Sequence, residues 1–155
     1  MKLFRISPIG VVGAIASGLL SGAFYSLGHV FGQRVGFSVV GIATFMAATI
    51  LGGAAFQWPV GHLSDRYDRR WVLFGVCLCG AAVALAGFYF ALDSETALIG
   101  LGVIYCFFTF FIYGLSVAHV NDLIERERVL EVTGGLLLLH GVGAAIGPTV
   151  AGGLM

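Results

Sequence analysis

The stretch GHLSDRYDRR, residues Gly61–Arg70, carries a cluster of charges between two long segments that contain no Asp, Glu, Lys or Arg. The charge-free segments cover 35–64 and 71–92. Because the hydrocarbon core of a membrane needs about 20 apolar residues of α-helix, both segments are long enough to cross it. The stretch therefore predicts a charged loop that joins two transmembrane helices.

The composition of the whole chain also predicts a membrane protein. Of its 155 residues, 59% are hydrophobic and 10% are charged, and the mean hydropathy is +1.00. A soluble domain of this composition would have too little polar surface. Backbone amides in lipid must be bonded within their own segment, which favours helices. We expect an all-α membrane protein with about five transmembrane helices, at about 8–32, 38–61, 71–92, 97–120 and 130–155.

The basic residues predict how these helices are oriented. Since loops rich in Lys and Arg stay in the cytoplasm, we expect a cytoplasmic N-terminus and a cytoplasmic 61–70 loop. Arg34 alone falls on the opposite side. The first apolar segment is too long for a cleavable signal peptide and is expected to be retained. The net charge of zero gives no sign of a nucleic-acid partner. The basic residues expected on the cytoplasmic side are Lys2, Arg5, Arg66, Arg69, Arg70, Arg126 and Arg128.

The 61–70 stretch resembles the loop signature of the major facilitator superfamily (MFS), G-x-L-x-D-R-x-G-R-R. In that family the signature joins the second and third helices of a six-helix transporter half. The resemblance therefore implies a membrane transporter. Asp68 stands where the family has glycine, a departure that affects the turn but not the charge pattern. The residues that we assign to a gating loop are Gly61, Asp65, Arg66, Arg69 and Arg70.

The physical chemistry of this loop suits a gate. Gly61 has no side chain, so a helix can end there in close contact with a neighbour. Asp65 is placed to accept hydrogen bonds from the amides of a helix N-terminus, while the arginines hold the loop at an anionic membrane surface. Such a clasp would form in one conformation and break in the other. The alternative, an ordinary positive-inside loop, explains the arginines but not the order Gly-x-Leu-x-Asp-Arg.

The fifth predicted helix carries a second resemblance, to the pattern G-x8-G-x3-G-P-x2-G-G of the superfamily's antiporters. Ala151 replaces the first glycine of the terminal pair. Small residues four apart form a face on which another helix approaches closely, and proline bends a helix. A generic packing face is the alternative interpretation. The matching residues of this helix-packing motif are Gly134, Gly143, Gly147, Pro148 and Gly152.

Together these resemblances cover essentially the whole chain, residues 1–155, as one MFS-type half-domain. A half in this family has six helices and a complete transporter has twelve, so we expect an incomplete half that stops in or after its fifth helix. The runs 52–59 and 134–139 also resemble the C-terminal half of a YcaD-like bacterial subgroup, which implies the bacterial inner membrane. An N-terminal half is the competing assignment.

Polar residues at helical spacing mark the expected solute cavity. In the superfamily the first and fourth helices of a half line the cavity, and the third stays outside. The first predicted helix carries a polar residue at every fourth position from Ser17 to His29, and the fourth carries a similar series from Tyr105 to Ser116. Helix packing explains each single residue equally well. Our substrate-cavity candidates are Ser21, Tyr25, Tyr105, Thr109, Tyr113 and His140.

His140 is the titratable candidate, because imidazole inside a membrane helix needs water or a partner. It either receives a coupling proton, bonds a substrate, or bonds across a helix interface without changing its charge. The four histidines lie on different segments and the three cysteines lack metal or redox spacing, so we expect no metal and no cofactor. We find no nucleotide-binding loop and no plausible catalytic triad, so we expect no enzyme.

We therefore predict a transporter that moves a small solute by alternating access. Its partners would be the lipid bilayer, a small-molecule substrate and a complementary transporter half. The charge-free runs leave no Asp, Glu, Lys or Arg deep within a predicted span, so a neutral or apolar substrate fits this half. The alternative is a non-transporting membrane interaction protein or a degenerate transporter fragment.

Overall fold

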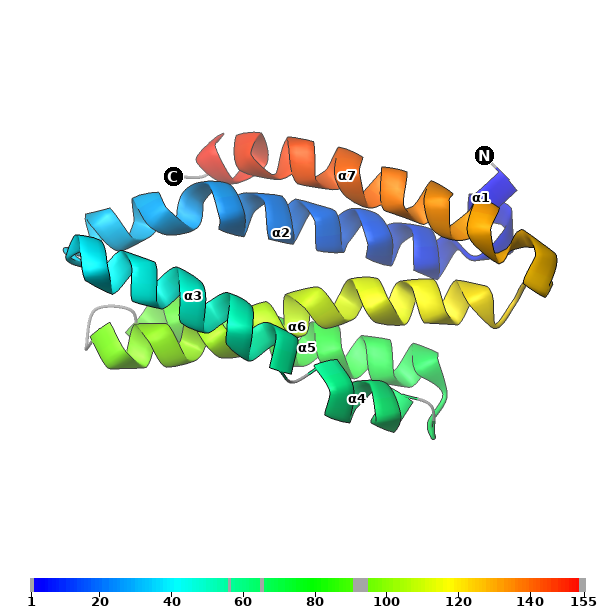
Figure 1. Ribbon diagram of the computed structural model, residues 1–155, viewed down its shortest axis with the longest axis horizontal. Coiled ribbons are helices and arrows are strands. Elements are labelled where there is room, and N and C mark those ends of the chain that lie inside the picture. Colours follow the sequence, from blue (N-terminus) through cyan, green and yellow to red (C-terminus); the bar gives the residue numbers. More distant parts are fainter. Residues whose placement is uncertain (1, 56, 65, 91–94, 154–155) are drawn as a thin grey trace.

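The computed structural model describes residues 2–55, 57–64, 66–90 and 95–153. Its described residues form helices and no strand, which confirms the all-α prediction. Figure 1 shows these helices lying side by side along the long axis of the molecule. The elements are α1 Lys2–Ile6, α2 Pro8–Arg34, α3 Val39–Ala55, α4 Gln57–Ser64, α5 Arg69–Phe90, α6 Glu95–Asn121, the short 3-10 helix η1 Arg126–Arg128, and α7 Val129–Gly153.

Local sequence explains where α2 begins and ends. The Ser7 hydroxyl accepts a hydrogen bond of 3.1 Å from the Gly10 amide, so Ser7 is the N-cap. Pro8 suits the first helical position, because the amide that it lacks would have no partner there. After the helix, Gly36 has a φ of +84°, a left-handed conformation that glycine adopts without strain. This turn leads the chain into α3.

The helix predicted over 38–61 is not one element in the structure. It corresponds to α3 and α4, and Phe56 between them lies outside the described residues. Pro59 gives a physical reason, since it has no N–H to bond the carbonyl of Ala55 and yet is tolerated in the first turn of a new helix. With its 17 residues, α3 is a shorter apolar helix. Four other elements are long and apolar enough to cross a membrane, namely α2, α5, α6 and the η1–α7 segment.

The last three predicted helices, over 71–92, 97–120 and 130–155, correspond to α5, α6 and α7. Each helix begins one or two residues earlier than the sequence suggests. Residues 91–92 and 154–155, which the predicted ranges include, lie outside the described part of the chain. The short α1 at the start of the chain was not predicted.

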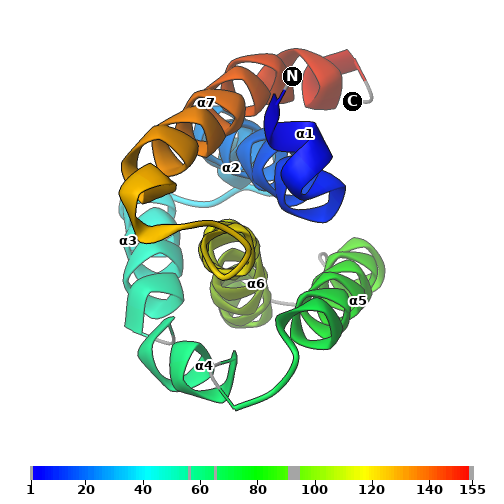
Figure 2. The same cartoon turned by 90° about the vertical axis from the view of Figure 1, so that its right-hand side faces the viewer.

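Helix α6 lies at the centre of the bundle, as the end-on view in Figure 2 shows. It packs against α2, α3 and α5. One buried apolar cluster joins α2, α6 and α7 around Ala14, Val120 and Leu136. A second cluster joins α5 to α6 through Leu73 and Leu115. The rest of α5 exposes a row of large apolar side chains.

Helices α2 and α7 approach so closely that backbone lies against backbone. A Cβ atom added at Gly143 or Gly147 would overlap backbone atoms of α2. A Cβ atom added at Gly18 or Gly22 would overlap backbone atoms of α7 in the same way. Such interfaces need small residues, because any side chain would push the helices apart. The contact therefore depends on four glycines, two from each helix.

The predicted helix-packing motif is only partly at this contact. Gly143 and Gly147 are buried in it, whereas a Cβ atom added at Gly134 or Gly152 would meet no atom within 4 Å. The reason is the helical period, since Gly143 and Gly147 share one face of α7 and the other two glycines point elsewhere. Pro148 lies inside α7, which continues to Gly153.

One end of the bundle gathers the segments that carry most of the positive charge. Figure 1 shows α1, the turn between α4 and α5, and the connection from α6 to α7 at the same end, opposite the turn between α2 and α3. Together with Arg69 and Arg70 at the start of α5, these segments contain seven of the eight basic residues. Their common location agrees with the predicted clustering of charge on one side. Which side of a membrane this end faces stays a prediction.

Candidate functional site

The turn before α5 is closed by Asp68. Its carboxylate Oδ1 accepts a hydrogen bond of 2.9 Å from the Arg70 amide. Its backbone carbonyl accepts from the amides of Trp71 at 3.0 Å and Val72 at 3.2 Å. Aspartate is among the preferred residues at helix starts, because its carboxylate satisfies exposed amides. The residue that departs from the family pattern thus has its own structural role.

An ion pair connects this turn to the far end of α6. The Nε atom of Arg69 lies 2.7 Å from Oδ2 of Asp122, the residue that follows α6. The Arg69 side chain is 22% exposed and that of Asp122 is 54% exposed. A pair this open to water is worth about 1 kcal/mol or less. The contact is therefore specific in geometry and easy to break.

The other predicted gating residues are placed differently. The side chain of Arg66 is exposed and its Nη2 lies 3.5 Å from Nε2 of His62, while Arg70 is also exposed. Asp65 lies outside the described residues, so its role stays a prediction. A Cβ atom added at Gly61 would meet no atom within 4 Å, so the close helix contact expected there is wrong for the described residues. The physical reason is that Gly61 borders a pocket.

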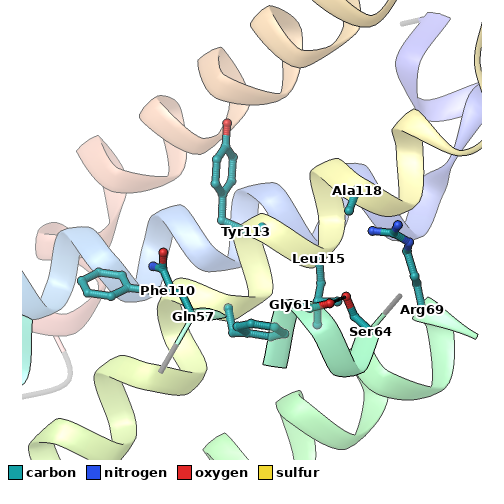
Figure 3. A pocket seen from close by; sticks show the side chains of 10 residues that line it. Gln57, Gly61, Ser64, Arg69, Phe110, Tyr113, Leu115 and Ala118 are labelled. Atoms are coloured by element: carbon teal, nitrogen blue, oxygen red, sulfur yellow. Dashed lines mark hydrogen bonds between the residues drawn. The ribbon is translucent and has the colours of Figure 1, made fainter. Parts of the chain in front are cut away.

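That pocket has a volume of about 340 Å³ and lies between α4, α5 and α6. The Ser64 hydroxyl at its edge donates a hydrogen bond of 2.8 Å to the Gly61 carbonyl. Figure 3 shows Arg69 next to Ser64, with Tyr113 farther along α6 and pointing away from both. The pocket thus lies directly beside the ion pair. Its lining residues are Gln57, Gly61, Ser64, Arg69, Phe110, Phe111, Tyr113, Gly114, Leu115 and Ala118.

The small polar residues predicted for the cavity are buried between helices. Ser21 is 7% exposed and Thr109 is 3% exposed. The Thr109 hydroxyl donates to the carbonyl of Tyr105 in its own helix at 3.0 Å. Ser116 and Thr49 donate in the same way to carbonyls of their own helices. For Thr109 this bond inside the helix favours the packing alternative over contact with a solute.

The larger predicted residues are more open. Tyr25 on α2 is 45% exposed, and its ring stacks on Phe110 of α6 with ring centroids 6.2 Å apart. Tyr105 is partly buried, with its ring centroid 6.4 Å from that of Phe24. Aromatic side chains therefore line the seam between α2 and α6. These rings offer flat apolar surface to a solute.

His140 lies where α2, α6 and α7 meet. Its Nδ1 atom is 3.0 Å from the Ser17 hydroxyl on α2, and its ring centroid is 4.6 Å from that of Tyr113 on α6. Both His140 and Tyr113 are partly buried. The structure thus brings together two of the predicted cavity residues, His140 and Tyr113. Ser21 and Tyr25 follow Ser17 on α2 at successive steps of four residues.

These contacts include residues that were not among the predicted site residues, and Asp122 and Phe110 are two of them. Asp122 pairs with Arg69, and the available signal was an acidic residue directly after an apolar span on the side of the basic loops. Phe110 stacks on Tyr25, and nothing in its sequence context separates it from its neighbours, three other phenylalanines between 107 and 111. Among the described residues, no group of three His, Cys, Asp or Glu side chains is placed to hold a metal ion.

Comparison with known proteins adds to this geometry. A family model described as Major Facilitator Superfamily matches residues 6–155. An uncharacterized MFS-type transporter of Enterobacter sp. (strain 638) is 32% identical over 158 residues, which cover 100% of this chain and 39% of that protein. The uncharacterized MFS-type transporter YcaD of Escherichia coli O17:K52:H18 is 30% identical, with the same coverage.

A further uncharacterized MFS-type transporter, from Yersinia enterocolitica, is 29% identical over 97% of this chain and 38% of its own length. The chain therefore spans about two fifths of the length of these curated relatives. The similarity to YcaD bears out the resemblance to a YcaD-like subgroup. No solved structure matches the chain.

Proposed function

Because the chain belongs to the major facilitator superfamily, we propose that it forms part of a secondary transporter, which moves a small solute by alternating access. Its apolar helices make it an integral membrane protein. The transporter would carry its solute across the bacterial inner membrane without chemical conversion. The end that holds α1 and the 66–68 turn would face the cytoplasm, because it collects the basic residues.

The observation that carries this proposal is the ion pair between Arg69 and Asp122. It joins the signature turn to the end of α6, and both segments lie at one end of the bundle. Alternating access requires contacts that hold one end closed in one state and release it in the other. A partly exposed ion pair meets this requirement, because water replaces the lost contact at a cost of about 1 kcal/mol or less. We assign it the role of a latch.

The test compares solute uptake in membrane vesicles that contain the full-length gene product and in empty vesicles. Both are offered a mixture of small metabolites, and the accumulated compounds are identified by mass spectrometry. We expect at least one solute to accumulate only with the protein, and the Asp122→Asn variant to lose most of that uptake. The control is Glu131→Gln, which breaks the exposed pair of 3.7 Å with Arg128 at the same end. Equal loss in both variants would remove the latch, and no accumulation would count against transport.

The proposal also requires a second bundle, because the chain spans only about two fifths of its relatives' length. Further sequence of the same gene product or another chain would supply it. The intact mass of the protein isolated from native membranes distinguishes these sources. A species more than twice the 16.3 kDa calculated for this chain supports the first. A species of 16.3 kDa that transports nothing would favour the membrane interaction protein instead.

A further inference from the structure

His140 is held on the buried face of α7. Leu136 and Gly143, which lie four residues before and three residues after it, are both buried against the neighbouring helices. The ring therefore points into the region where α7 meets α2 and α6, where Ser17 and Tyr113 contact it. An imidazole at this depth needs hydrogen-bond partners for its polar atoms.

The hydrogen bonds of Ser17 favour one position for the ring proton of His140. The Ser17 hydroxyl donates to the Ala14 carbonyl at 2.9 Å, and a hydroxyl has one proton to give. Its oxygen lone pairs then remain to accept at the 3.0 Å contact with His140. A neutral imidazole that donates through Nδ1 leaves Nε2 as a bare acceptor. Ser17 is thus a positioning residue for the tautomer of His140.

The Nε2 atom of this ring is not fully enclosed by the described residues. Among the described residues, no buried side-chain nitrogen or oxygen lacks a hydrogen-bond partner. The hydrogen bond that the described residues give to the His140 ring is the one at Nδ1. It follows that Nε2 is not fully enclosed by the described residues, and its ring lies beside that of Tyr113.

We propose that Nε2 of His140 accepts a hydrogen bond from a neutral, planar solute that carries an O–H or N–H group. The ring of Tyr113 beside it offers a flat face to such a solute. A charged solute would lack a charged partner here, because no Asp, Glu, Lys or Arg occurs in the segments 7–33, 96–121 and 132–155. This inference rests on the proposed function, because it names the solute class that the transporter would bind.

The experiment uses nitrogen nuclear magnetic resonance, which distinguishes a protonated ring nitrogen from a bare one. The full-length gene product is labelled at histidine with the heavy nitrogen isotope and placed in phospholipid nanodiscs, and His140→Gln assigns the signals. Ser17→Ala removes the acceptor, whereas Ser21→Ala removes another buried serine, four residues farther along α2, and serves as the control. Phenol and anisole are added as probes, because they share a ring and only phenol donates a hydrogen bond.

We expect a protonated Nδ1 and a bare Nε2 in the unchanged protein and in Ser21→Ala, and a loss of this preference in Ser17→Ala. Phenol should shift the Nε2 signal in a saturable way, and anisole should not. A protonated Nε2 in the unchanged protein, or equal responses to both probes, would overturn the inference. These readouts do not depend on uptake. A failed transport assay with the expected spectra would therefore count against the proposed function and leave the hydrogen-bond site in place.

Discussion

The loop end of the bundle and the contact between α2 and α7 hold helices together in opposite ways. At the loop end, the partners Arg69 and Asp122 are long, charged and partly open to water. Between α2 and α7, four glycines bring the backbones together and leave no space for a side chain. When the ion pair opens, water takes over its hydrogen bonds. When the glycine contact opens, no other group restores the packing that is lost. The molecule thus combines a rigid pair of helices with a releasable connection.

The largest effect is expected at the glycine contact. Gly143→Val places a side chain against backbone atoms of α2, which cannot yield as a flexible side chain does. We expect a loss of about 1–3 kcal/mol or more in the free energy of unfolding. Gly134→Val on the same helix is the matched control, because a Cβ atom added there would meet no atom within 4 Å. Thermal unfolding in detergent, followed by circular dichroism, measures both. Similar midpoints for the two variants would show that the close approach is not needed.

A smaller effect is expected at Asp68, which caps the start of α5. Asp68→Ala should cost about 0.5–2 kcal/mol, because it leaves the Arg70 amide without its carboxylate acceptor. Asp68→Gly introduces the residue of the family pattern and should cost only a few tenths of a kcal/mol, as glycine is itself tolerated at helix starts. The same unfolding experiment distinguishes the two. A cost for glycine as large as for alanine would mean that the lost carboxylate hydrogen bond, and not the backbone preference of the turn, sets the cost.

A still smaller contribution to stability is expected from the Arg69–Asp122 pair. A double-mutant cycle with Arg69→Gln and Asp122→Asn should give a coupling of about 0.2–1 kcal/mol, because both side chains are partly exposed. The coupling should fall as salt concentration rises. Unfolding midpoints of the four proteins at low and high salt measure it. A large, salt-insensitive coupling would contradict the description of this contact as easily released.

The smallest effect is expected at the Arg128–Glu131 pair, whose atoms lie 3.7 Å apart on an exposed helix start. Pairs three residues apart on a helix surface contribute about 0.2–0.5 kcal/mol. Glu131→Gln should therefore leave the unfolding midpoint nearly unchanged. If Glu131→Gln lowered the free energy of unfolding more than Asp122→Asn does, the ranking of the two ion pairs would be reversed.

The helices were predictable from the sequence because charge-free runs of membrane length leave few alternatives. The division of 38–61 into α3 and α4 was missed, since Pro59 disrupts hydrogen bonding locally while the hydropathy of the run stays continuous. Partners distant in the chain were beyond sequence reasoning. Ser17 and His140 lie 123 residues apart, and only the packing of α2 on α7 brings them into contact. Arg69 and Asp122 meet for the same reason, through the packing of α5 on α6.

The hydroxyl groups that bond within their own helices have a consequence for how the protein enters its membrane. Thr49, Thr109 and Ser116 each satisfy their polar hydrogen on a carbonyl three or four residues earlier. A helix whose polar groups are all hydrogen-bonded internally can move from the insertion machinery into the membrane by itself, before its neighbouring helices are made. His140 depends on Ser17 from the first long helix, so α7 completes its bonding only once it reaches α2. Insertion and assembly would then be coupled at α7 and independent at α3 and α6.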